Sequence, residues 1–142
     1  MTNREGVVIA MPDSGAVFRC EPDGRALELF ASGLRNPQEL AFDADGNLWT
    51  GDKARWTLLL QGADYGWRIG WQWLPKMGAW NSERLWQMPG TNTAAYLVPP
   101  VAHVGHGPAG IAYNPGTGLG TAYADTFFLS GFPGGVRTFR VA

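Results

Sequence analysis

Short apolar runs separated by turn residues make up most of this chain. Twenty glycines and ten prolines recur at intervals too short for helices of three or four turns. The runs are rich in β-branched and aromatic residues, which favours strands. The strands predicted in this way cover residues 6–11, 16–20, 26–31, 39–43, 48–52, 55–62, 109–114, 126–132 and 135–142.

One strand pattern occurs twice. Pro37–Asp43 reads PQELAFD and Pro108–Asn114 reads PAGIAYN, so both copies fit P-x-x-[L/I]-A-[F/Y]-[D/N] at a distance of 71 positions. Each copy leads into a turn and a further strand, as in the blades of a β-propeller. Blades run to about 40–50 residues, so the longer spacing predicts an insertion. We place it at about 72–105, a stretch rich in Trp, Pro and Gly without strand periodicity.

The arrangement of the copies predicts the architecture. If the repeated motif is the first strand of a blade, the chain starts on second-, third- and fourth-strand equivalents and ends after a third strand. The predicted fold is therefore an all-β, partial β-propeller domain over residues 1–142, with about two and a half blades. Closed propellers have about four to eight blades. We expect the remaining blades or another chain to complete it, because open blades leave unpaired strand edges.

Composition narrows the function classes. Hydrophobic residues make up 45% of the chain and the net charge is -1, with no basic stripe, so nucleic acid is not an expected partner. Cys20 is alone, which excludes an internal disulfide, and it is expected to be a small apolar filler. The start of the sequence shows no signal peptide, and no apolar run approaches the ~20 residues of a membrane helix, so we expect a soluble chain. These features assign no compartment.

Three stretches carry a resemblance to a known family. They are GLRNPQELAFDADGNLWTGD (33–52), GADYGWRIGWQW (62–73) and HGPAGIAYNPGTGL (106–119). Together they resemble the six-bladed propellers of the glucose/sorbosone dehydrogenase family, which includes soluble quinoprotein sugar dehydrogenases that use pyrroloquinoline quinone. The segments GDKARW, GWRIGWQ and YLVPP are more similar still to the propeller of dehydrogenase-like proteins that carry a c-type haem module. Proteins of these families are mostly periplasmic or secreted.

The resemblance implies a role for Arg35 and Asn36 as contacts to the quinone cofactor. The cofactor is a tricarboxylate with ortho-quinone oxygens, for which Arg offers a planar charged fork and Asn a neutral donor. Pro37 fixes its own φ and restricts Asn36 to an extended backbone, which aims the pair away from the strand. A structural alternative stays open. Arg35 could bridge neighbouring blades through backbone carbonyls, and Asn36 could cap the turn.

The implied parent reaction is hydride transfer from a sugar or alcohol hydroxyl to the quinone. The family's catalytic base is a histidine upstream of the Arg-Asn pair, and no His precedes Arg35 in this chain. His103 and His106 form an H-x-x-H pair without a visible third metal ligand, so a polar loop role is expected for them. The alternative function is a non-catalytic propeller that binds a carbohydrate or a protein and is linked to a haem module in longer relatives. Whether the chain is an enzyme stays open.

Aromatic and acidic residues supply weaker candidates. Four tryptophans, which lie in or beside the insertion, could stack a sugar ring or pack one blade against another: Trp71, Trp73, Trp80 and Trp86. The DADGN segment (43–47) is expected to be a hairpin turn. Asp64 is expected in a turn with Tyr65 and Gly66, and a weak site role stays open for it.

The quinoprotein enzymes hold a calcium ion beside the cofactor, and the charged residues around the end of the strand at 48–52 indicate whether this chain keeps that site. Asp52, Lys53 and Arg55 are expected to form a surface ion-pair cluster. The family's longer polar loop is missing after Asp52, and calcium needs six to eight oxygen ligands. The sequence therefore predicts that this calcium site is lost and that no metal is bound.

Overall fold

The computed structural model describes residues 4–7, 14–52, 55–67, 98, 100–105 and 107–141. The chain divides into two units, Met1–Arg35 with Leu60–Pro99 and Asn36–Leu59 with Pro100–Ala142, and each is considered by itself. Within the described ranges the regular structure is strands and a short 3-10 turn, with no α-helix. None of these residues belongs to a helix long and apolar enough to cross a membrane. Most of the predicted insertion lies outside the described residues.

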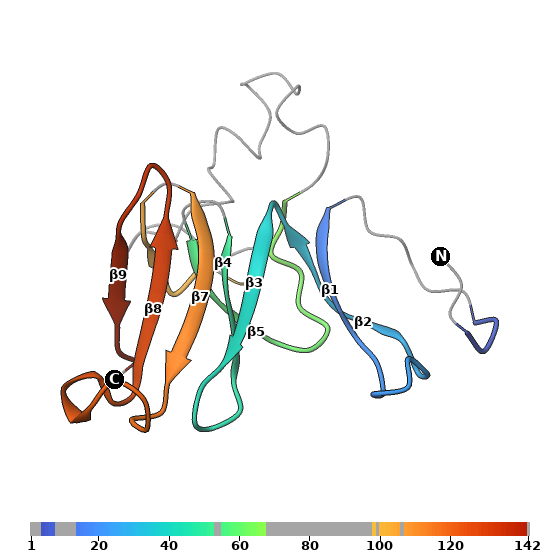
Figure 1. Ribbon diagram of the computed structural model, residues 1–142. Coiled ribbons are helices and arrows are strands. Elements are labelled where there is room, and N and C mark those ends of the chain that lie inside the picture. Colours follow the sequence, from blue (N-terminus) through green and yellow to red (C-terminus); the bar gives the residue numbers. More distant parts are fainter. Residues whose placement is uncertain are drawn as a thin grey trace, which may run out of the picture. The chain divides into compact units, whose positions relative to one another are not determined.

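The first unit contains a hairpin of two antiparallel strands, β1 (Gly15–Arg19) and β2 (Glu28–Leu34) (Figure 1). A segment far along the chain, residues 60–67, runs beside β2. The Gly62 N–H donates to the Phe30 carbonyl at 2.7 Å, and the Tyr65 N–H donates to the Ser32 carbonyl at 2.9 Å. These bonds explain why β2 continues to Leu34, three residues past the predicted strand.

A glycine allows this close approach. Gly33 has a φ of 76°, and a Cβ atom there would lie 2.1 Å from Asp64 Oδ1. Any side chain at this position would therefore collide with the neighbouring segment. Tyr65 links back to the first residue of this segment, since its buried hydroxyl accepts a hydrogen bond from the Leu60 N–H at 2.9 Å.

The second unit consists of two antiparallel sheets (Figure 1). The first has the order β3 (Pro37–Phe42), β4 (Leu48–Asp52), β5 (Arg55–Leu59) and β6 (Ala102–His103). The second has the order β7 (Pro108–Asn114), β8 (Thr126–Gly131) and β9 (Val136–Phe139), with the 3-10 turn η2 (Thr121–Tyr123) before β8. β3 and β7 carry the two copies of the repeated motif, and each is the first strand of its sheet.

These sheets confirm the predicted fold class, an all-β chain built from propeller blades. The range predicted for β4 is matched residue for residue. One difference concerns β6, which lies in the range 72–105 where no strand is predicted. β6 pairs with β5 through only two residues, Ala102 and His103, which is too short to give a periodic sequence pattern.

The turn between β3 and β4 is the predicted hairpin at 43–47. Asp43 accepts hydrogen bonds from the Asn47 N–H at 2.9 Å and from Trp49 Nε1 at 2.8 Å. Slight burial acts to raise the pKa of Asp43, but these hydrogen bonds outweigh it and hold the pKa below its usual value. The Asp43 side chain therefore stabilises the turn.

The two sheets of the second unit pack together around a buried core. Its members are Trp49, Trp56, Val104, Ile111, Phe127 and Leu129. The Trp56 and Phe127 rings meet edge to face with their centroids 4.8 Å apart, a favourable aromatic geometry. All five residues of β4 are buried, so this strand is covered on both faces.

Gly51 brings the two sheets into close contact at the start of β7. A Cβ atom at Gly51 would lie 2.7 Å from the Pro108 Cβ. Nearby, Glu39 of β3 accepts a hydrogen bond from the Ile111 N–H at 3.0 Å. The repeated Pro thus packs directly against the middle strand of the neighbouring blade.

We expect Gly51→Ala to destabilise the protein by about 1–3 kcal/mol, because the added methyl group overpacks the contact with Pro108. Urea unfolding measures the change. The matched control is Gly118→Ala, where the nearest atom to the new Cβ, Asn114 Oδ1, is 3.9 Å away. The control should stay within about 0.5 kcal/mol of the wild type. Equal stabilities of the two variants would contradict the close packing.

Candidate functional site

Arg35 and Asn36 follow directly after β2, and both are exposed. Arg35 is the last residue of the segment Met1–Arg35 in the first unit, and Asn36 is the first residue of the second unit. The surroundings of each residue are therefore described within its own unit. The Asn36 side chain accepts a hydrogen bond from Gln38 Nε2 at 2.8 Å through its Oδ1 atom. This bond points the carbonyl end of the amide toward the Gln38 side chain.

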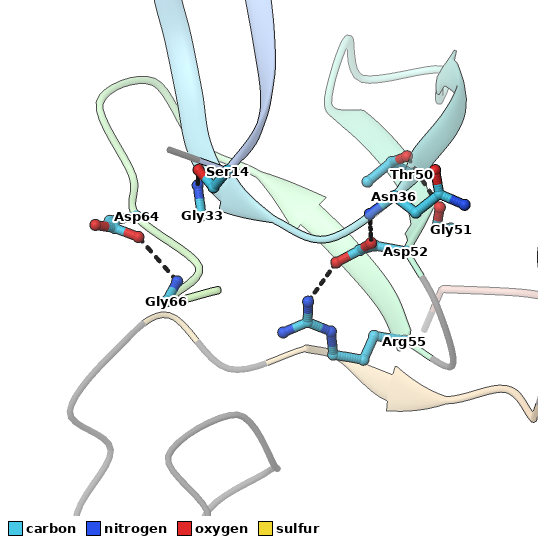
Figure 2. A network of polar contacts seen from close by, with 9 residues as sticks. All are labelled: Ser14, Gly33, Asn36, Thr50, Gly51, Asp52, Arg55, Asp64 and Gly66. Atoms are coloured by element: carbon cyan, nitrogen blue, oxygen red, sulfur yellow. Dashed lines mark hydrogen bonds and ion pairs between the residues drawn. The ribbon is translucent and has the colours of Figure 1, made fainter. Parts of the chain in front are cut away.

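Asp52 at the end of β4 fixes the backbone of Asn36. Its Oδ1 atom accepts a hydrogen bond from the Asn36 N–H at 2.6 Å, and its Oδ2 atom forms a close ion pair with Arg55 Nη2 (Figure 2). Asp52 is fully buried, and the Arg55 side chain is only 10% exposed. One carboxylate therefore joins β5 to the residue that precedes β3.

The expectation of a surface ion-pair cluster is wrong for Asp52 and Arg55. β4 and β5 are the two middle strands of their sheet, and Asp52 and Arg55 are register partners at one buried end of this strand pair. A buried pair follows different energetics from a surface one. Removing one partner leaves an unpaired buried charge and destabilises the fold by about 3–5 kcal/mol, whereas replacing both partners with apolar groups often leaves the stability unchanged. Lys53 lies outside the described residues.

His103 lies far from Asn36 across the same sheet. The register aligns Pro37 with Asp52, Asp52 with Arg55, and Arg55 with His103. Strands lie about 4.8 Å apart, so β6 is about 14 Å from β3. His103 is exposed on this outer strand, while His106 lies outside the described residues. The part of the chain that the structure describes holds no group of three His, Cys, Asp or Glu side chains that could bind a metal.

Asp64 shapes the segment beside β2 in the first unit. Its Oδ1 atom accepts a hydrogen bond from the Gly66 N–H at 2.8 Å (Figure 2). The predicted turn differs from the structure, in which the turn lies at residues 61–62 and Asp64 forms a parallel bridge with Ser32. In the same unit the Gly33 N–H donates to Ser14 Oγ at 2.9 Å. Burial raises the pKa of the Tyr65 hydroxyl, so this group stays neutral and structural. The four tryptophans considered for sugar stacking lie outside the described residues.

A cavity of about 310 Å³ opens beside the end of β9. Its walls are formed by Ala122, Tyr123, Thr126, Thr138, Phe139 and Arg140. Arg140 spans one side, because its Nε atom donates to Thr126 Oγ1 at 3.1 Å and its Nη2 atom to the Ala122 carbonyl at 2.5 Å. Sequence reasoning missed this cavity, since its residues follow no recognised motif.

The four-stranded and three-stranded sheets, each opened by the same Pro motif, define the class of fold as that of a β-propeller. The chain is similar to the PQQ-bound form of the aldose sugar dehydrogenase of Streptomyces coelicolor, with 20% identity and a TM-score of 0.59 over 90% of this chain and 35% of that one. It is also similar to a crystal structure of glucose dehydrogenase, with 22% identity and a TM-score of 0.52 over 85% of this chain and 36% of that one.

These likenesses confirm the predicted relationship to sugar dehydrogenase propellers at the level of fold. The chain spans about a third of the length of the two solved structures. No protein-family model matches the chain, and no curated protein sequence matches it significantly.

Proposed function

We propose that the chain is a segment of a sugar or alcohol dehydrogenase-like propeller and that Arg35 and Asn36 contact pyrroloquinoline quinone. The carrying observation is the buried Asp52 carboxylate, which holds the Asn36 backbone through a 2.6 Å hydrogen bond. A ligand contact gains affinity when its geometry is fixed before binding. A PQQ-bound protein of the same fold, the aldose sugar dehydrogenase, supports the choice of ligand.

The donor set fits this cofactor. Arg35 is exposed and carries a permanent charge, so its guanidinium can bind a carboxylate or the quinone oxygens through paired hydrogen bonds. Asn36 already uses its Oδ1 atom toward Gln38, which leaves the donor end of the amide, Nδ2, as the group suited to a quinone oxygen. When bound, the quinone supplies the hydride acceptor, and the protein supplies binding and orientation.

The proton acceptor of such a reaction is not assigned to this chain. His103 lies on the outer strand of its sheet, far from Asn36. In our proposal this group comes from the remaining blades, which also complete the propeller around the cofactor. The sugar or related alcohol that is oxidised would bind there too.

Asp52 does not fit a calcium site. Its oxygens already accept hydrogen bonds from Arg55 and from the Asn36 backbone, and the Arg55 charge repels a cation. Calcium prefers several carboxylate and carbonyl oxygens. We therefore propose that the calcium ion implied by the resemblance has no place at Asp52.

Calcium titration of the metal-stripped protein tests this proposal. We expect calorimetry to show no specific site tighter than millimolar, because the guanidinium already neutralises the carboxylate. A one-to-one micromolar site that disappears in Asp52→Ala would contradict it.

Arg35→Ala tests the quinone contact. We expect PQQ affinity to fall by about 1.5–3 kcal/mol, the range for a hydrogen bond to a charged group, with little change in stability. Fluorescence titration measures affinity, and thermal unfolding measures stability. The matched control is Arg25→Ala, an exposed arginine paired with Asp23 in another turn, which should leave the affinity unchanged. Unchanged PQQ affinity with a large loss of stability in Arg35→Ala would make Arg35 a blade-bridging residue.

The second candidate function is a non-catalytic propeller that binds a carbohydrate. The cavity beside β9 favours it, because 310 Å³ falls in the size range of small-molecule sites and Tyr123 offers an aromatic wall. Saturable binding of a neutral monosaccharide that Tyr123→Ala abolishes would support this candidate over the first. In this case the dehydrogenase-like fold would serve recognition, as in a protein linked to a haem module.

A further inference from the structure

The second copy of the internal repeat can be compared with the first to find what the buried ion pair adds to a blade. In the first copy Pro37 is the register partner of Asp52, and in the second copy Pro108 is the register partner of Gly131. Gly131 therefore occupies the place of Asp52. The next strand begins in register with these positions, at Arg55 in one sheet and after Gly135 in the other.

The second copy forms the same strand arrangement, and its described residues, 107–141, contain no buried charged pair. There backbone bonds close the end of the blade, since the Phe132 N–H donates to the Gly107 carbonyl at 2.9 Å and the Gly131 N–H to the Gly135 carbonyl at 3.1 Å. The Arg137 side chain of β9 adds a hydrogen bond to the Val104 carbonyl, but it has no carboxylate partner among the described residues. The three strands β7, β8 and β9 pair in the same order as β3, β4 and β5. A blade of this type thus does not require Asp52 or Arg55.

Burying a carboxylate and a guanidinium carries a desolvation cost that the second copy avoids. What the first copy gains is a fixed backbone at Asn36. We propose that Asp52 is a positioning residue for the ligand contact at Asn36, and that Arg55 orients the Asp52 carboxylate. This inference rests on the proposed function.

The geometry explains how the positioning works. The Asp52 carboxylate binds the Asn36 N–H at 2.6 Å, while the ring of Pro37 restricts the Asn36 backbone to extended conformations. Asn36 is therefore held on both sides of its Cα atom, by a hydrogen bond before it and by steric restriction after it. A backbone fixed in this way keeps the Cα–Cβ direction of Asn36 without a ligand, and the hydrogen bond from Gln38 restrains the amide group.

Two double variants test the positioning role, and they differ only in the acceptor that they offer to Asn36. Asp52→Ala with Arg55→Met removes the charges and the acceptor. Asp52→Asn with Arg55→Met removes the charges but keeps an amide oxygen in the place of Oδ1. Neither variant leaves an unpaired buried charge, so both are expected to melt within a few degrees of each other.

The readouts are hydrogen exchange of the Asn36 amide and PQQ affinity, measured on the whole chain beside the wild type. We expect the exchange of Asn36 to be at least tenfold faster in the Ala variant than in the Asn variant, and PQQ to bind about tenfold more weakly. If the Asp52–Arg55 pair had only a structural role, two variants of equal stability would show the same exchange rate and the same PQQ affinity. Equal exchange rates, equal PQQ affinities despite different exchange rates, or failure of either variant to fold would overturn the inference.

The outcome also separates this inference from the proposed function. If the wild type does not bind PQQ at all, the proposed function fails, while the exchange rates still decide whether Asp52 fixes Asn36. If the wild type binds PQQ and the two variants bind it equally, the function stands and the positioning role fails.

Discussion

Burial of the middle strands β4 and β5 on both faces is the constraint on which the second unit depends. All five residues of β4 are buried, and its Trp49 forms the core together with Trp56 of β5 and residues of the second sheet. The same burial includes Asp52, where β4 ends, and Arg55, where β5 begins. A carboxylate without water needs other hydrogen-bond donors. Asp52 finds them in the guanidinium and in the Asn36 backbone, which links core packing to an exposed pair of polar residues.

Glycine and proline positions let the two sheets come together. The backbone of Gly51 lies against Pro108, where any larger residue would collide. Pro108 belongs to the repeated motif, whose first copy places Pro37 beside Asp52. The same Pro therefore serves packing in one copy and restricts the backbone of Asn36 in the other. The repeat gives one architecture, and the residues at its strand ends differentiate the copies.

Much of the fold follows from the sequence because its signals are local. Turn residues directly precede β4, and the Pro motif reveals β3 and β7 as equivalent strands. The deviations depend on distant contacts. β2 extends to Leu34 because residues 62–67 bond to it, and the two-residue β6 exists only through its pairing with β5. Neither effect leaves a periodic signal.

The candidate site was predictable only in part. Arg35 and Asn36 stand out beside Pro37, but the partner of their backbone does not. Asp52 and Arg55 flank a short connection and resemble an ordinary surface pair in sequence. Their burial arises only in the folded structure and leaves no local signal in the sequence. One signal could have revealed it, namely that Asp52 ends one apolar strand and Arg55 begins the next, so that the two charges face each other in the sheet.

A crystal structure of the protein soaked with PQQ tests the central claim most directly. The account predicts carboxylate or quinone oxygens of PQQ within hydrogen-bond distance of the Arg35 guanidinium and of Asn36 Nδ2, with Asp52 still accepting the Asn36 N–H. PQQ bound only elsewhere, such as in the cavity beside Tyr123, or an Asp52 side chain turned away from Asn36, would contradict it.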